Sequence, residues 1–253
     1  MMDVIAAEAV KARSVRSTTA LVTVCVAAVP IGALMALISA GVWDSATAVE
    51  RSHFEALGDG TAVLFVVQMC LMAVGILAAT TEYTSGMIRT SLTAVPLRRE
   101  FALAKASVVG ALTLVVGTVV SVLVLFASRA IIGDRPIGDL RSLAEGFPVV
   151  LAQGLGMAVI ALIGLGLGLY IKSTAGTLVT MAVLLFGVPI LPWVLLPKPW
   201  SGRVVAVLPS QLPNELGGAG ITHLSPAGAL LAMALWVVLA LAIGVSAVKR
   251  RDA

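Results

Sequence analysis

The sequence predicts an all-α membrane protein with six transmembrane helices. Of its 253 residues, 59% are hydrophobic and only 12% are charged, and the mean hydropathy is +1.06. Charged residues divide the chain into six uncharged runs. Each run reaches the roughly 20 apolar residues that a helix needs to cross about 30 Å of hydrocarbon. The runs are continuously apolar, without the alternation typical of barrel strands, so they favour helices.

We interpret the whole chain, residues 1–253, as one transmembrane domain. The predicted spans cover about residues 18–41, 61–81, 106–128, 147–171, 174–197 and 226–248. The first run is longer than the roughly 7 to 15 apolar residues of a cleavable signal peptide, which predicts a retained span. Pro30, Pro189 and Pro192 predict kinks or breaks in the first and fifth spans.

The distribution of positive charge predicts how the chain is oriented. An even number of spans puts both termini on one side, and eleven of the 17 Lys and Arg residues fall on that side. Because cytoplasmic loops carry the excess of Lys and Arg, both termini are expected in the cytoplasm. The basic pI of 9.4 then reflects this topology and contact with anionic lipid headgroups, not nucleic-acid binding.

The predicted spans contain no ionisable side chain of the kind that relays and intramembrane active sites require. Gln68 and Gln153 are their strongest polar groups. We expect these to form interhelical hydrogen bonds, with a substrate contact as the alternative. No P-loop is present, because Ile171 stands where a glycine must precede Lys172 and Ser173. The chain is therefore not expected to be an enzyme, and ATP-driven work would need a partner subunit.

Small residues and cysteines within the spans have simpler interpretations. Gly164 and Gly168 form a small-xxx-small pair, which predicts close helix packing in the fourth span. A dinucleotide fingerprint is excluded there, because Leu169 occupies the position of its third glycine. Cys25 and Cys70 both fall within spans, and we expect neither a disulfide nor a metal site.

The segment 81–105 is the longest predicted inner loop and has mixed charge. Glu82, Gly86 and Arg89 follow helical spacing and would share one face of a helix that ends before Pro96. Gly86 would let another molecule approach the backbone closely. The alternative is a solvated connector whose basic residues contact headgroups.

In this segment the sequence resembles the permeases of type-2 ABC exporters. Their signature is E-x-x-x-G-T-x-R-x-x-L-x-x-P-x-x-R-x-x-x-x-x-K, and the matching residues are Glu82, Gly86, Arg89, Leu92, Pro96, Arg99 and Lys105. The N-terminal stretch from Glu8 to Thr18 is similar to the E-W-x-K-L-R-S-x-R-S-T opening of many bacterial permeases. Met87 and Ala9 depart from these patterns, since the family usually has threonine and an aromatic residue there.

The resemblance implies a membrane-spanning subunit of an ATP-driven exporter in the bacterial cytoplasmic membrane. Its substrate would be amphipathic or hydrophobic: a drug, natural product, peptide or lipid. A second permease chain, identical or related, would complete the pathway within the membrane lipids. Two copies of an ABC ATPase subunit would carry ATP and Mg²⁺, and this chain itself would hold no cofactor. A membrane anchor or immunity-type subunit that recruits a partner protein without translocation is the alternative.

The resemblance also implies roles for particular residues. Residues 81–95 would form the coupling helix, in which Glu82 anchors the helix to the ATPase and to neighbouring helices. Arg89 would add a second charged contact, and Gly86 would permit close docking. Residues 204–214 would dip into the membrane as a re-entrant hairpin, with a surface loop as the alternative.

The resemblance also predicts where two further groups of residues lie. Three basic residues would lie on an interfacial elbow helix and reach the headgroups: Lys11, Arg13 and Arg16. Spans two and five would line the pathway with a soft, mostly apolar surface, with ordinary helix packing as the alternative. The expected lining residues are Phe65, Gln68, Met69, Met72, Met181 and Phe186.

Overall fold

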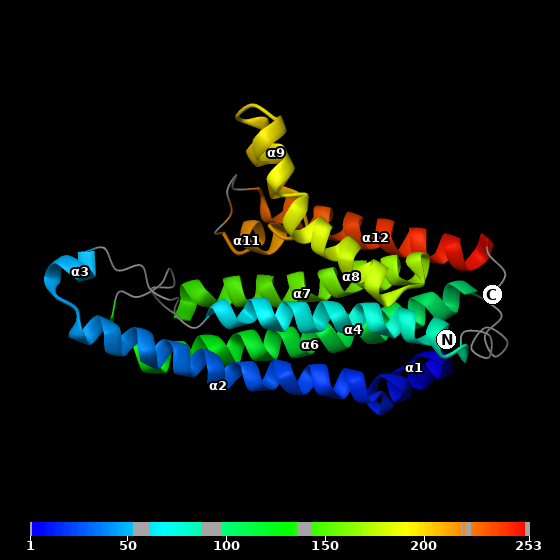
Figure 1. Ribbon diagram of the computed structural model, residues 1–253, viewed down its shortest axis with the longest axis horizontal. Coiled ribbons are helices and arrows are strands. Elements are labelled where there is room, and N and C mark those ends of the chain that lie inside the picture. Colours follow the sequence, from blue (N-terminus) through cyan, green and yellow to red (C-terminus); the bar gives the residue numbers. More distant parts are fainter. Residues whose placement is uncertain are drawn as a thin grey trace.

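The computed structural model describes residues 2–52, 61–87, 98–135, 143–218, 220 and 224–250. The described residues form helices, turns and short irregular connections, with no β-strand among them (Figure 1). Five of the helices are long and apolar enough to cross a membrane. The predicted all-α membrane fold is confirmed at this level.

The five long helices are α2 (Arg16–Ser45), α4 (Leu64–Thr84), α6 (Arg98–Ile132), α7 (Leu143–Ile171) and α12 (Pro226–Arg250). Shorter helical elements precede or connect them: α1 (Met2–Ser14), α3 (Ala48–Ser52), η1 (Thr61–Val63), α8 (Thr174–Ala182), η2 (Val183–Gly187), α9 (Ile190–Leu195), α10 (Trp200–Ala206) and α11 (Leu212–Leu216). Figure 1 shows α1 and the end of α12 at the same end of the bundle, opposite α3.

Helix α7 is the central helix and packs against α4, α6 and α12. In the most apolar stretch of α7, 72% of the residues are buried inside the protein, against 22% in the corresponding stretch of α2. A Cβ on Gly164 would lie 3.0 Å from Cγ1 of Ile76, and one on Gly168 would lie 3.0 Å from Cβ of Ala79. Both glycines therefore let α4 approach closely, which confirms the predicted packing of the small-xxx-small pair.

The predicted fifth span, residues 174–197, is a broken helix. Helix α8 passes into the π-helical turn η2, where the Val188 amide donates to the Val183 carbonyl at 2.8 Å. The chain then changes direction at Pro189, which has no amide hydrogen, and α9 projects away from the bundle (Figure 1). The predicted break is confirmed here, whereas α2 continues through Pro30.

Residues 204–214 belong to the short helices α10 and α11 and the turn between them. Val205 is 1% exposed and Leu212 is fully buried, so this segment packs within the protein. The Trp236 indole on α12 donates to the Val207 carbonyl at 2.9 Å. The segment therefore buries part of its apolar side chains and has a hydrogen-bonded partner in the bundle, while the choice between a re-entrant hairpin and a surface loop stays a prediction.

Gln153 joins this helix pair to the central helix. Its side-chain amide donates to Asn214 Oδ1 at 2.9 Å, which links α7 to α11. A Cβ on Gly156, one turn further along α7, would overlap the ring of Pro213. The interhelical hydrogen bond predicted for Gln153 is confirmed, and the partner is a short connecting helix.

Candidate functional site

Three helices meet where the chain begins: α1, the end of α4 and the start of α6. Val15 has an extended backbone (φ −78°, ψ 116°) and separates α1 from α2. This break lets α1 leave the direction of α2 and pack against α6. It places the polar face of α1 beside the polar ends of two transmembrane helices.

Four charged side chains from these helices form what we call the ion cluster: Glu8, Lys11, Glu82 and Lys105. Lys105 Nζ donates to Glu8 Oε2 at 2.6 Å and to Glu82 Oε1 at 2.9 Å. Lys11 Nζ donates to Glu8 Oε1 at 2.7 Å and to Glu82 Oε1 at 3.0 Å. Two ammonium groups thus alternate with two carboxylates, and the cluster has no net charge.

The ion cluster is largely withdrawn from solvent. Glu8, Glu82 and Lys105 are 5%, 6% and 4% exposed, whereas the Lys11 side chain is 32% exposed. Taking a charge out of water costs several kcal/mol per ion, and only well-placed opposite charges offset that cost. The four groups therefore depend on each other, and removing one leaves a buried charge without sufficient compensation.

The proton affinities of the α1 residues reflect this balance. Burial alone would raise the pKa of Glu8, but Lys105 and Lys11 together hold that pKa below its usual value. Burial would likewise lower the pKa of Lys11, yet hydrogen bonds to Glu8 and Glu82 and their negative charge raise it. Both groups are consequently charged across the physiological pH range.

Phe101 closes the buried side of the ion cluster. Its ring is 1% exposed, and its centroid lies 5.1 Å from Lys105 Nζ and 5.9 Å from Lys11 Nζ. An ammonium group over an aromatic face is attracted by the ring quadrupole, more strongly when water is excluded. Phe101 was missed by the sequence reasoning, although its position one helical turn before Lys105 is a signal that could have found it.

One carboxylate oxygen of the ion cluster has no hydrogen-bond donor among the described residues. Glu82 Oε2 is buried and accepts no hydrogen bond within the described part of the chain. Both lysines instead donate to Glu82 Oε1. A cavity of about 340 Å³ reaches this group and is lined also by Ser85 and Met87, which follow α4. Glu82 Oε2 can therefore accept a hydrogen bond from a further donor while Oε1 keeps its contacts with both lysines.

Only residues 81–87 of the coupling helix expected over residues 81–95 lie within the described part of the chain, and that helix is interrupted there. Helix α4 ends at Thr84, and Gly86 has a left-handed backbone (φ +72°) that separates α4 from the helical residue Met87. Glu82 lies in the last turn of α4 and is buried, not on an exposed face. Among the described residues, no atom lies within 4 Å of a Cβ built on Gly86, so there the glycine is required by its backbone conformation and not by a close neighbour. Arg89 lies outside the described residues.

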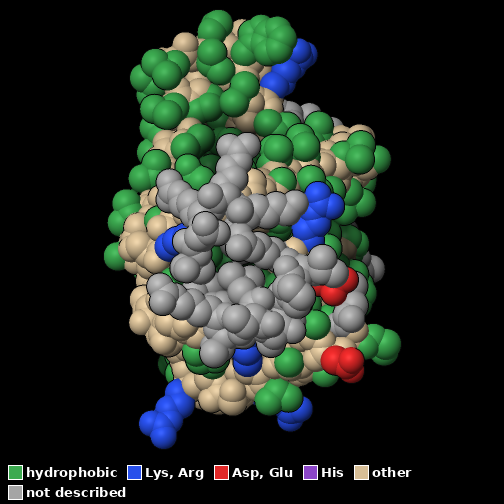
Figure 2. All heavy atoms as spheres, turned by 90° about the vertical axis from the view of Figure 1, so that its right-hand side faces the viewer, with side chains coloured by type: hydrophobic (Ala, Val, Ile, Leu, Met, Phe, Trp, Pro, Cys, Tyr) green, Lys and Arg blue, Asp and Glu red, His purple; other side chains and the backbone are tan. Residues whose placement is uncertain are grey.

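The three predicted elbow residues divide between two helices. Lys11 and Arg13 lie on α1, whereas Arg16 is the first residue of α2. Lys11 joins the ion cluster, and a headgroup contact of this side chain stays a prediction. Figure 2 views this end of the bundle and shows Lys and Arg side chains around its rim, with few Asp or Glu side chains.

The predicted pathway residues lie in two different environments. Met181 is fully buried and Met72 is 5% exposed, and both belong to the core cluster that joins α4, α7, α8 and α12, against which Met69 packs. Ordinary helix packing accounts for these methionines. Phe65 and Phe186 are instead 53% and 45% exposed, with ring centroids 5.7 Å apart.

Gln68 lies half-buried on α4, one turn after Phe65. It makes no hydrogen bond to another described residue, so its predicted interhelical bond is not formed within that part of the chain. A pathway-lining role for Phe65, Gln68 and Phe186 stays a prediction.

Comparisons with protein-family models and with curated proteins found no match to this chain.

Proposed function

We propose that this chain is the membrane-spanning permease subunit of an ATP-driven exporter, and that the ion cluster couples its spans to an ATPase subunit. The observation that carries the proposal is the position of the cluster on both sides of the α4–α6 connection, residues 85–97. Glu82 lies just before this connection and Lys105 lies in the second turn of α6 after it. Their 2.9 Å contact joins the two flanks directly.

The coupling argument follows from this geometry. A partner that displaces the α4–α6 connection acts on two helix ends that are held together by buried charges. Glu8 and Lys11 extend the same contacts to α1, so α1, α4 and α6 respond as one unit. Breaking buried ion pairs is costly, which favours movement of the whole unit over separation of its members.

The proposed topology has six crossings with both termini in the cytoplasm. Helix α7 ends at the end of the bundle that carries α1, and α12 returns to that same end (Figure 1). Residues 172–225 must therefore travel back through the bundle between them. Helix α8 and η2 together rise only about 21 Å, so in this topology the fifth crossing is a bent segment, whose last part, α9, leaves the bundle after the break (Figure 1). The predominance of Lys and Arg at the end with the termini supports a cytoplasmic location.

Helices α10 and α11 fit a re-entrant hairpin in this topology. Non-helical backbone at membrane depth requires burial within protein and internal hydrogen-bond partners. The turn at Val207 has a hydrogen-bond partner in Trp236, and α11 has one in Gln153 and buries Leu212 and Pro213. The hairpin would enter from the outer side, where α12 begins.

The cargo would be amphipathic or hydrophobic, and a second permease chain would complete its path. Phe65 and Phe186 form an exposed aromatic pair, and Gln68 lies on the neighbouring turn of α4. Such a surface offers apolar contact and one amide to a cargo or to a second chain. ATP and Mg²⁺ would bind the separate ATPase subunit, since this chain has no P-loop.

Purification of the tagged chain from its native membrane tests this function. We expect a soluble P-loop subunit to co-purify in a fixed ratio, and the complex in lipid nanodiscs to hydrolyse ATP. Substitution of the P-loop lysine in that subunit is the control and should abolish hydrolysis while both proteins remain associated. A chain that purifies with a partner lacking a P-loop would contradict the exporter and favour the anchor.

A further inference from the structure

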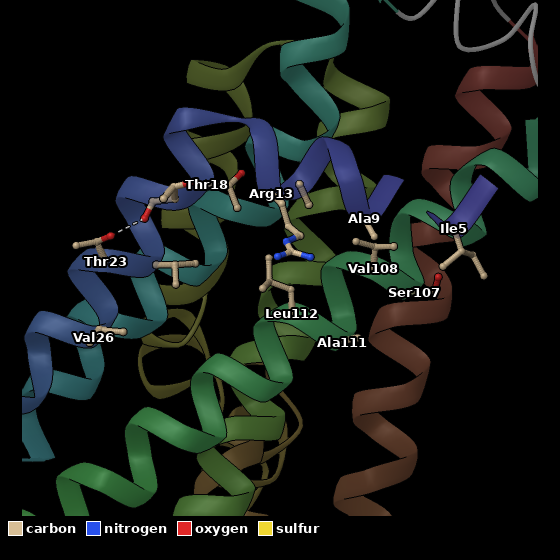
Figure 3. Close-up of a pocket in the computed structure, with 13 residues that line it drawn as sticks. Ile5, Ala9, Arg13, Thr18, Thr23, Val26, Ser107, Val108, Ala111 and Leu112 are labelled. Atoms are coloured by element: carbon tan, nitrogen blue, oxygen red, sulfur yellow. Dashed lines mark hydrogen bonds between the residues drawn. The ribbon is translucent and has the colours of Figure 1, made fainter. Parts of the chain in front are cut away.

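A groove of about 850 Å³ lies between α1, α2 and α6, next to the cavity that reaches the ion cluster. Figure 3 shows Ile5 and Ala9 of α1, Val26 of α2, and Val108 and Leu112 of α6 around it. This volume lies in the range of about 300–1,000 Å³ typical of pockets that bind small molecules. Its walls are mostly aliphatic, so it would hold an apolar chain.

The groove carries a positive group at its α1 end. The Arg13 guanidinium points into it from α1 towards Leu112 of α6 (Figure 3). Arg13 forms no ion pair or hydrogen bond with the rest of the described chain, in contrast to Lys11 two residues earlier. A guanidinium with five free donors suits a phosphate, which can accept two parallel hydrogen bonds.

The first turn of α2 adds further donors beside Arg13. Val15 occupies the N-cap position and offers no side-chain acceptor to the free amides of this turn. Thr18 and Thr19 of the same turn line the groove, and the Thr18 hydroxyl makes no hydrogen bond to another described residue. A helix N-terminus favours an anion through its free amides and its dipole.

Polarity in the groove follows the direction expected for a lipid. Arg13 and Thr18 lie at the elbow, where the proposed topology places the membrane surface, while Val22 and Val26 continue along α2 towards the bilayer centre. Val26 is 57% exposed, so this wall is open on the membrane side. A lipid with its anionic head at the elbow and an acyl chain along α2 would match both the polar end and the apolar wall of the groove.

We propose that this groove binds one anionic phospholipid, with the phosphate on Arg13 and the first turn of α2. The acyl chain lies along Val22, Val26 and Leu112. A zwitterionic lipid places a compensating cation near Arg13 and gains less from the site. The lipid thereby fixes the angle between α1 and α2, and α1 carries two members of the ion cluster.

Native mass spectrometry of the purified chain tests the proposal with phosphatidylglycerol and phosphatidylcholine of identical acyl chains. We expect phosphatidylglycerol to be retained about fivefold more, the preference expected from one basic residue. Arg13→Gln should remove this preference. Arg99→Gln is the matched control, because it removes the same charge from an exposed residue of α6 that does not line the groove. Equal retention of both lipids, or equal loss in both variants, would overturn the proposal.

Thermal unfolding in detergent gives a second readout that locates the lipid. Phosphatidylglycerol should raise the unfolding temperature of the wild-type chain, and inorganic phosphate at the same concentration should not. Ala111→Phe fills the groove from α6 and should abolish the shift while leaving the lipid-free unfolding temperature unchanged. A shift produced by phosphate alone, or one that survives Ala111→Phe, would show that the groove does not hold the lipid.

Discussion

Lys105 Nζ lies 2.6 Å from Glu8 Oε2, although the two residues are 97 positions apart in the chain. This contact fastens the N-terminal helix α1 to the start of α6, and both groups are almost fully buried. It means that α1 is a structural part of the bundle end, not a helix held at the membrane surface by lipid alone. Glu82 extends the same contact to α4.

Lys105→Met should destabilise the protein strongly. The substitution leaves Glu8 and Glu82 buried with Lys11 as their remaining cation, and loss of one partner from a buried ion pair costs about 3–5 kcal/mol. Thermal unfolding in detergent measures the effect. Arg99→Ala, which removes an exposed cation from the same helix, should change the free energy of unfolding by no more than about 0.5 kcal/mol. Equal effects of the two substitutions would show that the ion cluster adds no stability.

Stability should fall at both ends of the pH scale because of the ion cluster. The pKa of Glu8 is lowered from 4.5 on folding, so its contribution is complete above that value and disappears as the pH falls through the lower folded value. The pKa of Lys11 is raised from 10.5, so its contribution is complete below that value and disappears as the pH rises through the higher folded value.

Unfolding temperatures measured from pH 3 to 11 check this dependence. Glu8→Gln should flatten the acid side of the profile, and Lys11→Gln should flatten the alkaline side. A profile that neither substitution alters would contradict the assigned pKa directions.

Gly86→Ala should weaken the end of α4 through backbone strain. Its φ of +72° costs a residue with a Cβ about 1–2 kcal/mol. Asparagine tolerates this conformation better, so Gly86→Asn should behave more like the wild type. Hydrogen exchange of the last turn of α4 measures the difference. If a partner packs closely on Gly86, both variants should lose partner binding while differing in local stability.

Gly166→Val should prevent normal packing of α7 on α12. A Cβ at Gly166 would overlap the Ala240 carbonyl, and backbone atoms cannot move aside cheaply. Gly41→Ala on α2 is the control, because nothing lies within 4 Å of its new Cβ and alanine favours a helix. The yield of monodisperse protein should fall sharply for the first variant and stay unchanged for the second. Equal yields would show that α7 and α12 are not in close contact.

The helices could be predicted from the sequence more completely than their interruptions. Continuous apolar runs fix where long helices lie, because hydrocarbon excludes unpaired backbone, and small residues such as Gly164 indicate close packing. The interruption after α4 was missed, because the spacing of Glu82 and Gly86 suits one continuous helix over residues 81–95 and only the left-handed backbone of Gly86 reveals the stop. Pro189 signalled the break after η2, but not the departure of α9 from the bundle.

The ion cluster could be predicted only in part. Glu8, Glu82 and Lys105 all occupy positions of the recognised motifs, yet nothing local to the chain shows that they meet. Their contact depends on the turn at Val15 and on how α1 folds against α6, which are tertiary features. The burial of Glu82 could not be predicted for the same reason, since it depends on the contacts of Glu82 with α1 and α6.

The proposed role of the ion cluster in coupling is tested most directly by movement at the far end of the bundle. A spin label on Ser45→Cys, in a chain that carries Cys25→Ala and Cys70→Ala, reports the separation of two permease chains in the complex. Trapping the ATPase subunit with ATP and vanadate should change this separation in the otherwise wild-type complex. In Glu82→Gln, which keeps the side-chain shape and removes the charge, the partner should still bind and hydrolyse ATP while the separation stays fixed. The same ATP-dependent change in Glu82→Gln as in the wild type would contradict coupling through the ion cluster.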